Sequence, residues 1–176
     1  MLRLFLVVIV FGFFMNAVYG QAKVRLNLVV NQVQNIVINP DQTTLSLVYS
    51  TLEDYQRGVE LIKRAHITVF STEAFEVKVR LANEEFSRLD NSGVQKVKLP
   101  NVKVKASSST PISAVTFPQA NLNTHGSTLI RSNVPIMGTD FDVTYKGPGG
   151  NDLVPFVDKA KKVVYSNEVL FRIETR

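Results

Sequence analysis

Apolar side chains recur at every second position in one segment after another of this chain. The clearest case is HITVFSTEAFEVKVRLA, in which Ile67 and Val69 precede a polar break at residues 71–73 and a second alternating run begins at Phe75. A period of two residues is that of an extended strand, whose successive side chains point to opposite faces of a sheet. The pattern therefore predicts two strands here, joined as a hairpin.

The same alternation returns between turn signals such as Asn39-Pro40-Asp41 and Pro100-Asn101. About 8–10 short strands separated by turns are typical of an all-β antiparallel β-sandwich or barrel, and we predict the sandwich. The core residues that we expect to be buried are Phe75, Val77, Val79, Phe141, Val143, Phe171 and Ile173.

One stretch, TLEDYQRGVELIKRAH, supports two interpretations. Apolar residues lie at helical spacing from Leu52 to Ile62, and Thr51 with Asp54 three residues later is a helix-start signal. Gly58 would cost a continuous helix about 1 kcal/mol relative to alanine. We favour a short helical turn over residues 52–56, with Gly58 as a turn before the next strand, while the longer helix stays open.

The first 20 residues, MLRLFLVVIVFGFFMNAVYG, have the layout of a signal peptide. Arg3 is followed by an apolar core over residues 4–14, which is shorter than the ~20 residues that span a bilayer. We expect cleavage between Gly20 and Gln21, which leaves residues 21–176 as a single β-sandwich domain without a transmembrane segment. An uncleaved N-terminal anchor is the alternative.

Composition narrows the setting and the chemistry. The chain has no cysteine, so burial rather than disulfides must hold the fold. Losing Arg3 with the leader lowers the formal net charge from +5 to +4, and no arginine-rich block is present, so nucleic acid is not an expected partner. We expect an exported protein of the periplasm, outer surface or extracellular space.

The residues offer no convergent catalytic set. His66 and His125 are the two histidines, and Gly-x-Ser-x-Gly, P-loop and His-Glu-x-x-His motifs are absent from the sequence. His66 stands at the start of an expected strand, where a structural role is favoured over that of a base, and His125 lies in a polar turn. We therefore expect a non-enzymatic protein without a cofactor.

The aspartates likewise give only weak evidence for a catalytic or metal-binding site. Asp140 and Asp142 flank Phe141 and should share the outer face of a strand, which favours solvated side chains over a glycosidase pair. Asp152, in the GPGGND loop, and the nearby Asp158 lack the alternating acidic pattern of a calcium-binding EF-hand. We read that glycine-rich loop as a surface loop.

Basic residues alternate with apolar ones on several expected strands. A sheet built in this way has one apolar face and one cationic face, which could hold an acidic polysaccharide. Lysines on exposed faces and edges also keep sheets soluble, and we favour this second interpretation. The candidate polyanion-binding residues are Lys78, Arg80, Lys96, Lys98, Lys103 and Lys105.

Alternation also begins almost directly after the leader, in QAKVRLNLVV. Val24, Leu26, Leu28 and Val30 would share one face of a strand. Such a strand is either the first strand of a self-complete domain or a donor that completes the sheet of a neighbouring molecule. We prefer the self-complete domain, and donation stays open.

The stretches IVINPDQTTLSLVYST, FDVTYKG and VVYSNEVLFRIET resemble a family of small exported β-sandwich proteins, of unknown or pilin-like function, from Gram-negative bacterial envelopes. The resemblance implies an immunoglobulin-like or pilin-like sandwich without catalytic residues. It also implies envelope or surface proteins as partners, including self-association by strand exchange. Chaperone–usher fimbrial subunits are a more distant likeness, since they commonly carry a disulfide.

These observations predict a non-enzymatic, exported structural or adhesive protein of the bacterial envelope or surface, with a pilin-like subunit as one form. The alternative is a binding module for anionic glycans or cell-surface polymers, acting through the lysine-rich face.

Overall fold

The computed structural model describes residues 23–90, 93–158 and 162–176. The chain divides into two units, Met1–Asn31 and Gln32–Arg176, and each is described by itself. The leader and its expected cleavage point lie outside the described residues. Within the second unit the structure is all-β with antiparallel pairing, which confirms the predicted fold class.

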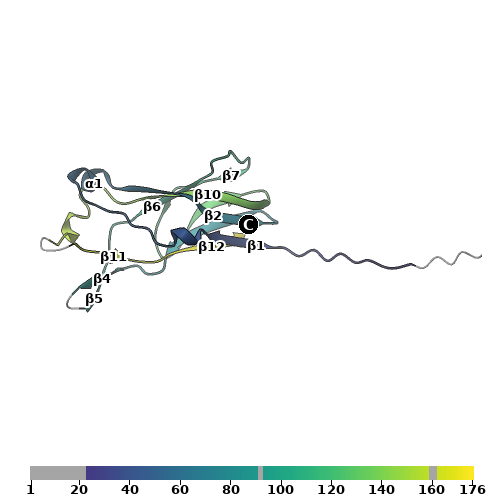
Figure 1. Ribbon diagram of the computed structural model, residues 1–176, viewed down its shortest axis with the longest axis horizontal. Helices are drawn as coiled ribbons and strands as arrows, with labels where there is room; N and C mark the ends of the chain where they lie inside the picture. The colour runs from purple at the N-terminus through teal and green to yellow at the C-terminus, as the bar shows by residue number, and fades with distance from the viewer. Residues whose placement is uncertain (1–22, 91–92, 159–161) are drawn as a thin grey trace, which may run out of the picture. The chain divides into compact units, whose positions relative to one another are not determined.

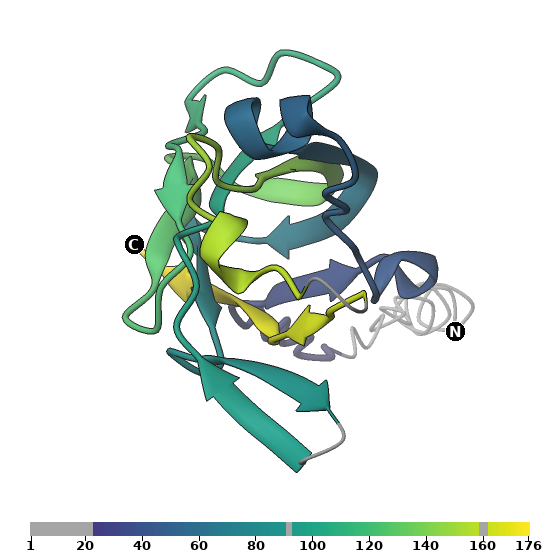
Figure 2. The ribbon, with the colours of Figure 1, turned by 90° about the vertical axis from the view of Figure 1, so that its left-hand side faces the viewer.

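The strands of the second unit form three sheets (Figure 1 and Figure 2). The five-stranded sheet has the order β1 (Gln34–Ile38), β2 (Glu60–Ser71), β10 (Ile136–Lys146), β6 (Lys103–Ser107) and β8 (Ala120–Asn121). The four-stranded sheet has the order β12 (Val169–Thr175), β3 (Phe75–Leu81), β9 (Ser127–Ser132) and β7 (Val115–Thr116). The three-stranded sheet consists of β11 (Tyr165–Ser166), β4 (Phe86–Asp90) and β5 (Gly93–Val97).

The expected hairpin at residues 67–81 is wrong, although both of its strands exist. β2 pairs with β1 and β10, whereas β3 pairs with β12 and β9, so the chain changes sheets between them. The hydroxyl of the buried Ser71 donates to the carbonyl of Glu73 (2.9 Å) and accepts from its N–H (3.3 Å), which holds a tight corner. The polar break therefore turns the strand across the core rather than back along the same sheet.

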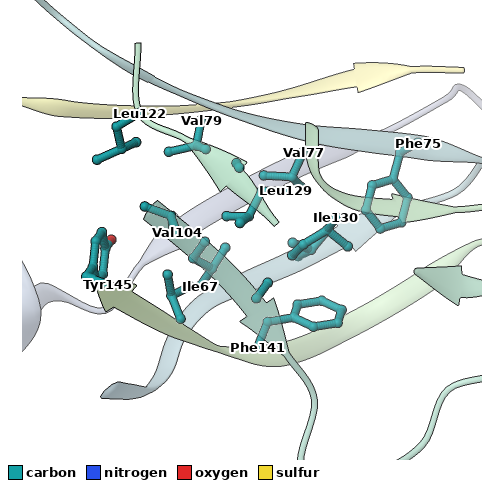
Figure 3. Packing of buried hydrophobic residues seen from close by; sticks show 14 of the residues in the cluster. Ile67, Phe75, Val77, Val79, Val104, Leu122, Leu129, Ile130, Phe141 and Tyr145 are labelled. Atoms are coloured by element: carbon teal, nitrogen blue, oxygen red, sulfur yellow. The ribbon is translucent and has the colours of Figure 1, made fainter. Parts of the chain in front are cut away.

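The five-stranded and four-stranded sheets share one hydrophobic core (Figure 3). Ile67 of β2 and Phe141 of β10 meet residues of β3 and β9 there. The buried hydrophobic residues are Ile67, Val69, Phe75, Val77, Val79, Leu81, Val104, Ala106, Ala120, Leu122, Leu129, Ile130, Ile136, Phe141, Val143 and Tyr145.

Five of the seven predicted core residues are fully buried, namely Phe75, Val77, Val79, Phe141 and Val143. The other two, Phe171 and Ile173, pack against the core but are only partly buried. They lie on β12, an edge strand of its sheet, where a side chain is less enclosed than on an inner strand. Their alternation was visible in the sequence, but their edge position was not.

The short helix predicted in the ambiguous stretch is confirmed. α1 spans Leu52–Arg57 and begins with a capping box between Thr51 and Asp54. Gly58 ends it with φ of 81°, a conformation that favours glycine, and β2 starts at Glu60. In the described part of the unit, two 3₁₀ turns are present, η1 (Pro40–Gln42) and η2 (Val154–Phe156).

The glycine-rich loop after β10 packs against α1. The N–H of Gly150 donates to the carbonyl of Gln56 (2.8 Å). A Cβ on Gly149 would lie 2.7 Å from the carbonyl carbon of Arg57, so only glycine permits this approach. Gly147, at the start of this expected surface loop, is buried, whereas Gly150 is exposed.

A bulge interrupts the pairing of β2 with β10. Phe141 lies opposite Ile67 and Val143 opposite Lys63, so residues 64–66 of β2 face Asp142 alone. Ala65 has φ of 45° at this point, and its N–H donates to Asp142 Oδ1 (2.8 Å). Arg64 donates to Asp142 Oδ2 at 2.6 Å.

Asp142 is therefore buried, at 7% exposure, and the prediction of a solvated side chain is wrong for it. The prediction is correct for Asp140, which is exposed and accepts a hydrogen bond from Thr68 (2.6 Å). Burial raises the pKa of the Asp142 carboxyl, but the hydrogen bonds from Ala65 and Arg64 and the charge of Arg64 outweigh it. The pKa consequently lies below its ordinary value of 3.8.

Replacing Asp142 should destabilise the fold much more than replacing its neighbour on the same strand. Asp142→Ala leaves the partly buried N–H of Ala65 without an acceptor and should lower the free energy of unfolding by about 1–3 kcal/mol. Asp140→Ala should lower it by less than about 0.5 kcal/mol. Urea unfolding of the two variants measures the difference, and equal losses would contradict a structural role for the Asp142 carboxylate.

Candidate functional site

The N-terminal segment Lys23–Asn31 is described without a helix or strand. Val24, Leu26, Leu28 and Val30 are between 81% and 93% exposed. The expected first strand over these residues is thus not observed, and the first strand of the structure is β1. Exposed apolar side chains at this density are uncommon in soluble proteins and mark surfaces that meet a partner.

The six predicted polyanion-binding residues are distributed over three sheets. Lys78 and Arg80 lie on β3, Lys96 lies on β5 with Lys98 just after it, and Lys103 and Lys105 lie on β6. The structure therefore does not gather them on a single cationic face. The alternation was read correctly within each strand, but the assignment of strands to sheets depends on pairing that local sequence does not encode.

Two of these residues are neutralised by carboxylates. Lys78 forms an ion pair with Glu174 at 2.6 Å, and Lys98 forms one with Glu84. The hydrogen bond and charge of Lys78 hold the pKa of Glu174 below its ordinary value. The hydrogen bond that Lys98 donates to Glu84, together with the negative charge of Glu84, raises the pKa of Lys98. These contacts fit the interpretation of lysines that keep the sheets soluble.

Two of the other candidates, Lys103 and Lys105, acquire a neighbour that the sequence did not identify. Lys103 lies directly opposite Lys146 of β10, and Lys105 lies opposite Thr144. Lys103, Lys105 and Lys146 are all exposed, and we call them the lysine triplet. No signal in the local sequence around Lys146 links it to β6, because the register between β6 and β10 brings them together.

His66 is buried in the core rather than placed as an accessible base. Its Nδ1 lies 3.0 Å from Gln42 Oε1 and its Nε2 lies 3.0 Å from the Tyr145 hydroxyl. The Gln42 amide nitrogen donates to the Arg64 carbonyl (2.9 Å), so Oε1 is the acceptor and Nδ1–H the donor. A neutral His66 then accepts at Nε2 from the Tyr145 O–H, and all three side chains are satisfied.

Burial, with a smaller effect from the charge of Lys63, lowers the pKa of His66 below its ordinary value of 6.5. Burial likewise raises the pKa of the Tyr145 hydroxyl. His125, in contrast, is exposed in a turn, where Asn123 Oδ1 accepts its backbone N–H at 2.9 Å. The structural role that we favoured for His66 agrees with its burial and with its hydrogen bonds to Gln42 and Tyr145.

The two aspartates of the glycine-rich loop region do not converge on one site. Asp158 forms an ion pair with Arg88 at 2.9 Å, while Asp152 is exposed. Across residues 23–90, 93–158 and 162–176, no group of three or more His, Cys, Asp or Glu side chains is arranged to hold a metal ion.

In the same part of the chain, no helix has the length and apolar character needed to cross a membrane.

The fold defines the chain as an all-β protein of antiparallel sheets around a shared core. Comparison of its sequence with protein-family models and with curated proteins gives no match.

The pH dependence of stability should report the neutral state of His66. Because the folded-state pKa is lowered, the unfolded chain binds a proton more readily, and stability is lost as pH falls below about 6.5. The melting temperature of the protein should therefore decrease between about pH 7 and pH 5. His66→Gln should flatten this dependence, whereas His125→Gln should retain it. An unchanged slope in His66→Gln would show that the imidazole does not carry the effect.

Proposed function

We propose that this protein is an exported, non-enzymatic structural or adhesive subunit of a bacterial cell envelope or surface, which attaches to a neighbouring protein by donating Lys23–Val30 as a β-strand. The observation that carries the proposal is the exposure of Val24, Leu26, Leu28 and Val30. They alternate as a strand does, yet they belong to no strand of the structure.

Strand addition would remove the apolar face of this segment from water. Burying one valine or leucine side chain contributes about 1.5–3 kcal/mol, and main-chain ladder bonds add to the affinity. Lys23, Arg25 and Asn27 alternate with the apolar residues and would face solvent or the rim of the partner. The segment therefore has the two faces that an added strand needs.

The proposed setting follows from the sequence at the N-terminus. Residues 1–20 have the layout of a cleavable leader, whose removal would place Lys23 close to a free amino terminus. The expected partners are envelope or surface proteins, including further copies of this chain.

The lysine triplet favours a second function, the binding of an anionic glycan or cell-surface polymer. Like charges directly opposite on neighbouring strands are destabilising, and Lys103 faces Lys146 in this way. A bound polyanion would relieve their repulsion and would bind less tightly at high salt.

Strand donation predicts concentration-dependent association of the chain that lacks residues 1–20. Light scattering after size-exclusion chromatography should show oligomers that grow with concentration. Leu26→Asp/Leu28→Asp should weaken association by at least about a hundredfold, since burying each unpaired carboxylate costs several kcal/mol. Asn27→Asp, on the polar face, is the matched control and should change it by less than about tenfold.

A synthetic peptide of residues 21–31 should compete with the intact chain and reduce the oligomers. A monomer at every concentration, in a sample whose N-terminal amides are protected from hydrogen exchange, would exclude donation to another copy.

Retention on an immobilised acidic polysaccharide tests the second function. Lys103→Gln/Lys105→Gln should elute at lower salt than the unchanged chain, whereas Lys78→Gln/Lys98→Gln, which removes the two paired lysines, should elute close to it. Equal elution of the two double variants would argue against the lysine triplet as the binding surface.

A further inference from the structure

The segment Thr44–Tyr49 has the side-chain pattern of a strand but lies outside every sheet. Its exposure alternates residue by residue, as in an extended backbone. Leu45 and Leu47 pack against the hydrophobic core, whereas Ser46 is exposed and Val48 is 55% exposed. It is therefore a strand-like segment that pairs with no strand in the described part of the chain.

Its backbone hydrogen-bonding groups lack partners among the described residues. Among the residues that the structure describes, none forms a hydrogen bond with a main-chain N–H or C=O of Thr44–Tyr49. The bonds resume on either side, where the Gln42 N–H donates to the Asn39 carbonyl (2.9 Å) and the Ser50 N–H donates to Asp54 Oδ2 (2.8 Å). Such a run of unpaired main-chain groups is a template for the addition of a strand.

The segment is held in place by its side chains. The Tyr49 hydroxyl donates to the Pro148 carbonyl at 2.8 Å, and the Tyr49 ring lies against that of Tyr55 with centroids 5.4 Å apart. A Cβ on Gly147 would come within 3.3 Å of Leu47 Cδ1, which shows how closely Leu47 packs there. A fixed, extended acceptor loses little conformational freedom when a second strand pairs with it.

Other edges of the described unit are protected. Natural sheets guard their edges with charged side chains, very short strands or a covering element. β5 carries Lys96, β12 carries Arg172 and Glu174, and β7, β8 and β11 contain two residues each. β1 has no charge, but it lies against β12, where Gln34 donates to the Thr175 hydroxyl at 3.0 Å. Thr44–Tyr49 contains no charged residue, proline or glycine.

We infer that Thr44–Tyr49 is the acceptor edge for Lys23–Val30 of a second copy of this chain. The inference rests on the proposed strand donation and names its partner. The donor of eight residues is long enough to cover the six of the acceptor. The charged residues of the donor are Lys23 and Arg25, and the acceptor is flanked in sequence by Asp41 and by Glu53. Because Glu53 already forms an ion pair with Arg57 at 3.0 Å, the strand orientation that brings the basic end of the donor toward Asp41 is favoured.

Disulfide trapping between two different single-cysteine variants tests the pairing. The chain has no cysteine of its own, so every disulfide joins introduced residues. In a mixture, a cross-linked dimer contains either one copy of each variant or two copies of the same variant. Samples of each variant alone identify the second kind of dimer. Arg25→Cys, Asn27→Cys and Val29→Cys, each in a separate chain, cover alternative registers on one face of the donor. Each is mixed with Ser46→Cys, and the matched control replaces Ser46→Cys by Gln95→Cys on the exposed face of β5.

At least one donor variant should give about tenfold more mixed dimer with Ser46→Cys than with Gln95→Cys, because a disulfide requires its two Cβ atoms to lie within about 4.5 Å. Chains that associate through residues 23–30 but trap equally at both positions would overturn the acceptor and leave strand donation standing. Chains that neither associate nor trap would overturn both. The double variant Asn27→Cys/Ser46→Cys tests whether the donor belongs to the same chain. If this variant stays monomeric and forms its disulfide only within one chain, the strand that pairs with Thr44–Tyr49 does not come from a second copy.

Discussion

The five-stranded sheet depends on how β2 and β10 accommodate a mismatch in length. Arg64, Ala65 and His66 stand opposite Asp142 alone, and its carboxylate satisfies Arg64 and the N–H of Ala65. Because the surplus on β2 is an even number of residues, alternation keeps the same face on both sides of the bulge. The same deviation turns His66 into the core, where its two hydrogen bonds join the strand to η1 and to β10. One buried carboxylate thus supports both the register of the sheet and a polar link through its core.

Much of the local structure was predictable because it depends on residues close together in the sequence. The period of two located Val77, Val79 and Val143 on buried faces, and the cap at Thr51 together with Gly58 delimited α1. The errors concern relations between distant segments. A polar break looks the same whether the chain returns beside its own strand or crosses to the facing sheet. The burial of Asp142 and the position of Lys146 beside β6 likewise follow from strand register.

The open surfaces of this protein are backbone surfaces as much as side-chain surfaces. Lys23–Val30 exposes alternating apolar side chains, and Thr44–Tyr49, whose side chains hold it against the core, has main-chain groups without a partner in the described part of the chain. The chain has no cysteine, so no disulfide ties either segment to the rest of the fold. Both segments therefore favour binding of a partner through main-chain hydrogen bonds between paired strands and through complementary side-chain shape. The scattered and partly neutralised lysines leave a smaller role for broad electrostatic attraction.

The corner at Ser71–Phe75 also determines how the domain can fold. Because β2 and β3 enter different sheets, these two consecutive strands form no hydrogen-bonded ladder with each other. β3 instead pairs with β12, and Phe75 meets Thr175 from near the far end of the chain. Neither sheet can therefore form to completion while the later strands are missing, and sheets built from such distant pairings fold slowly. During synthesis in sequence order, the four-stranded sheet therefore stays incomplete until its last strand arrives, and its exposed edges are open to aggregation throughout that interval.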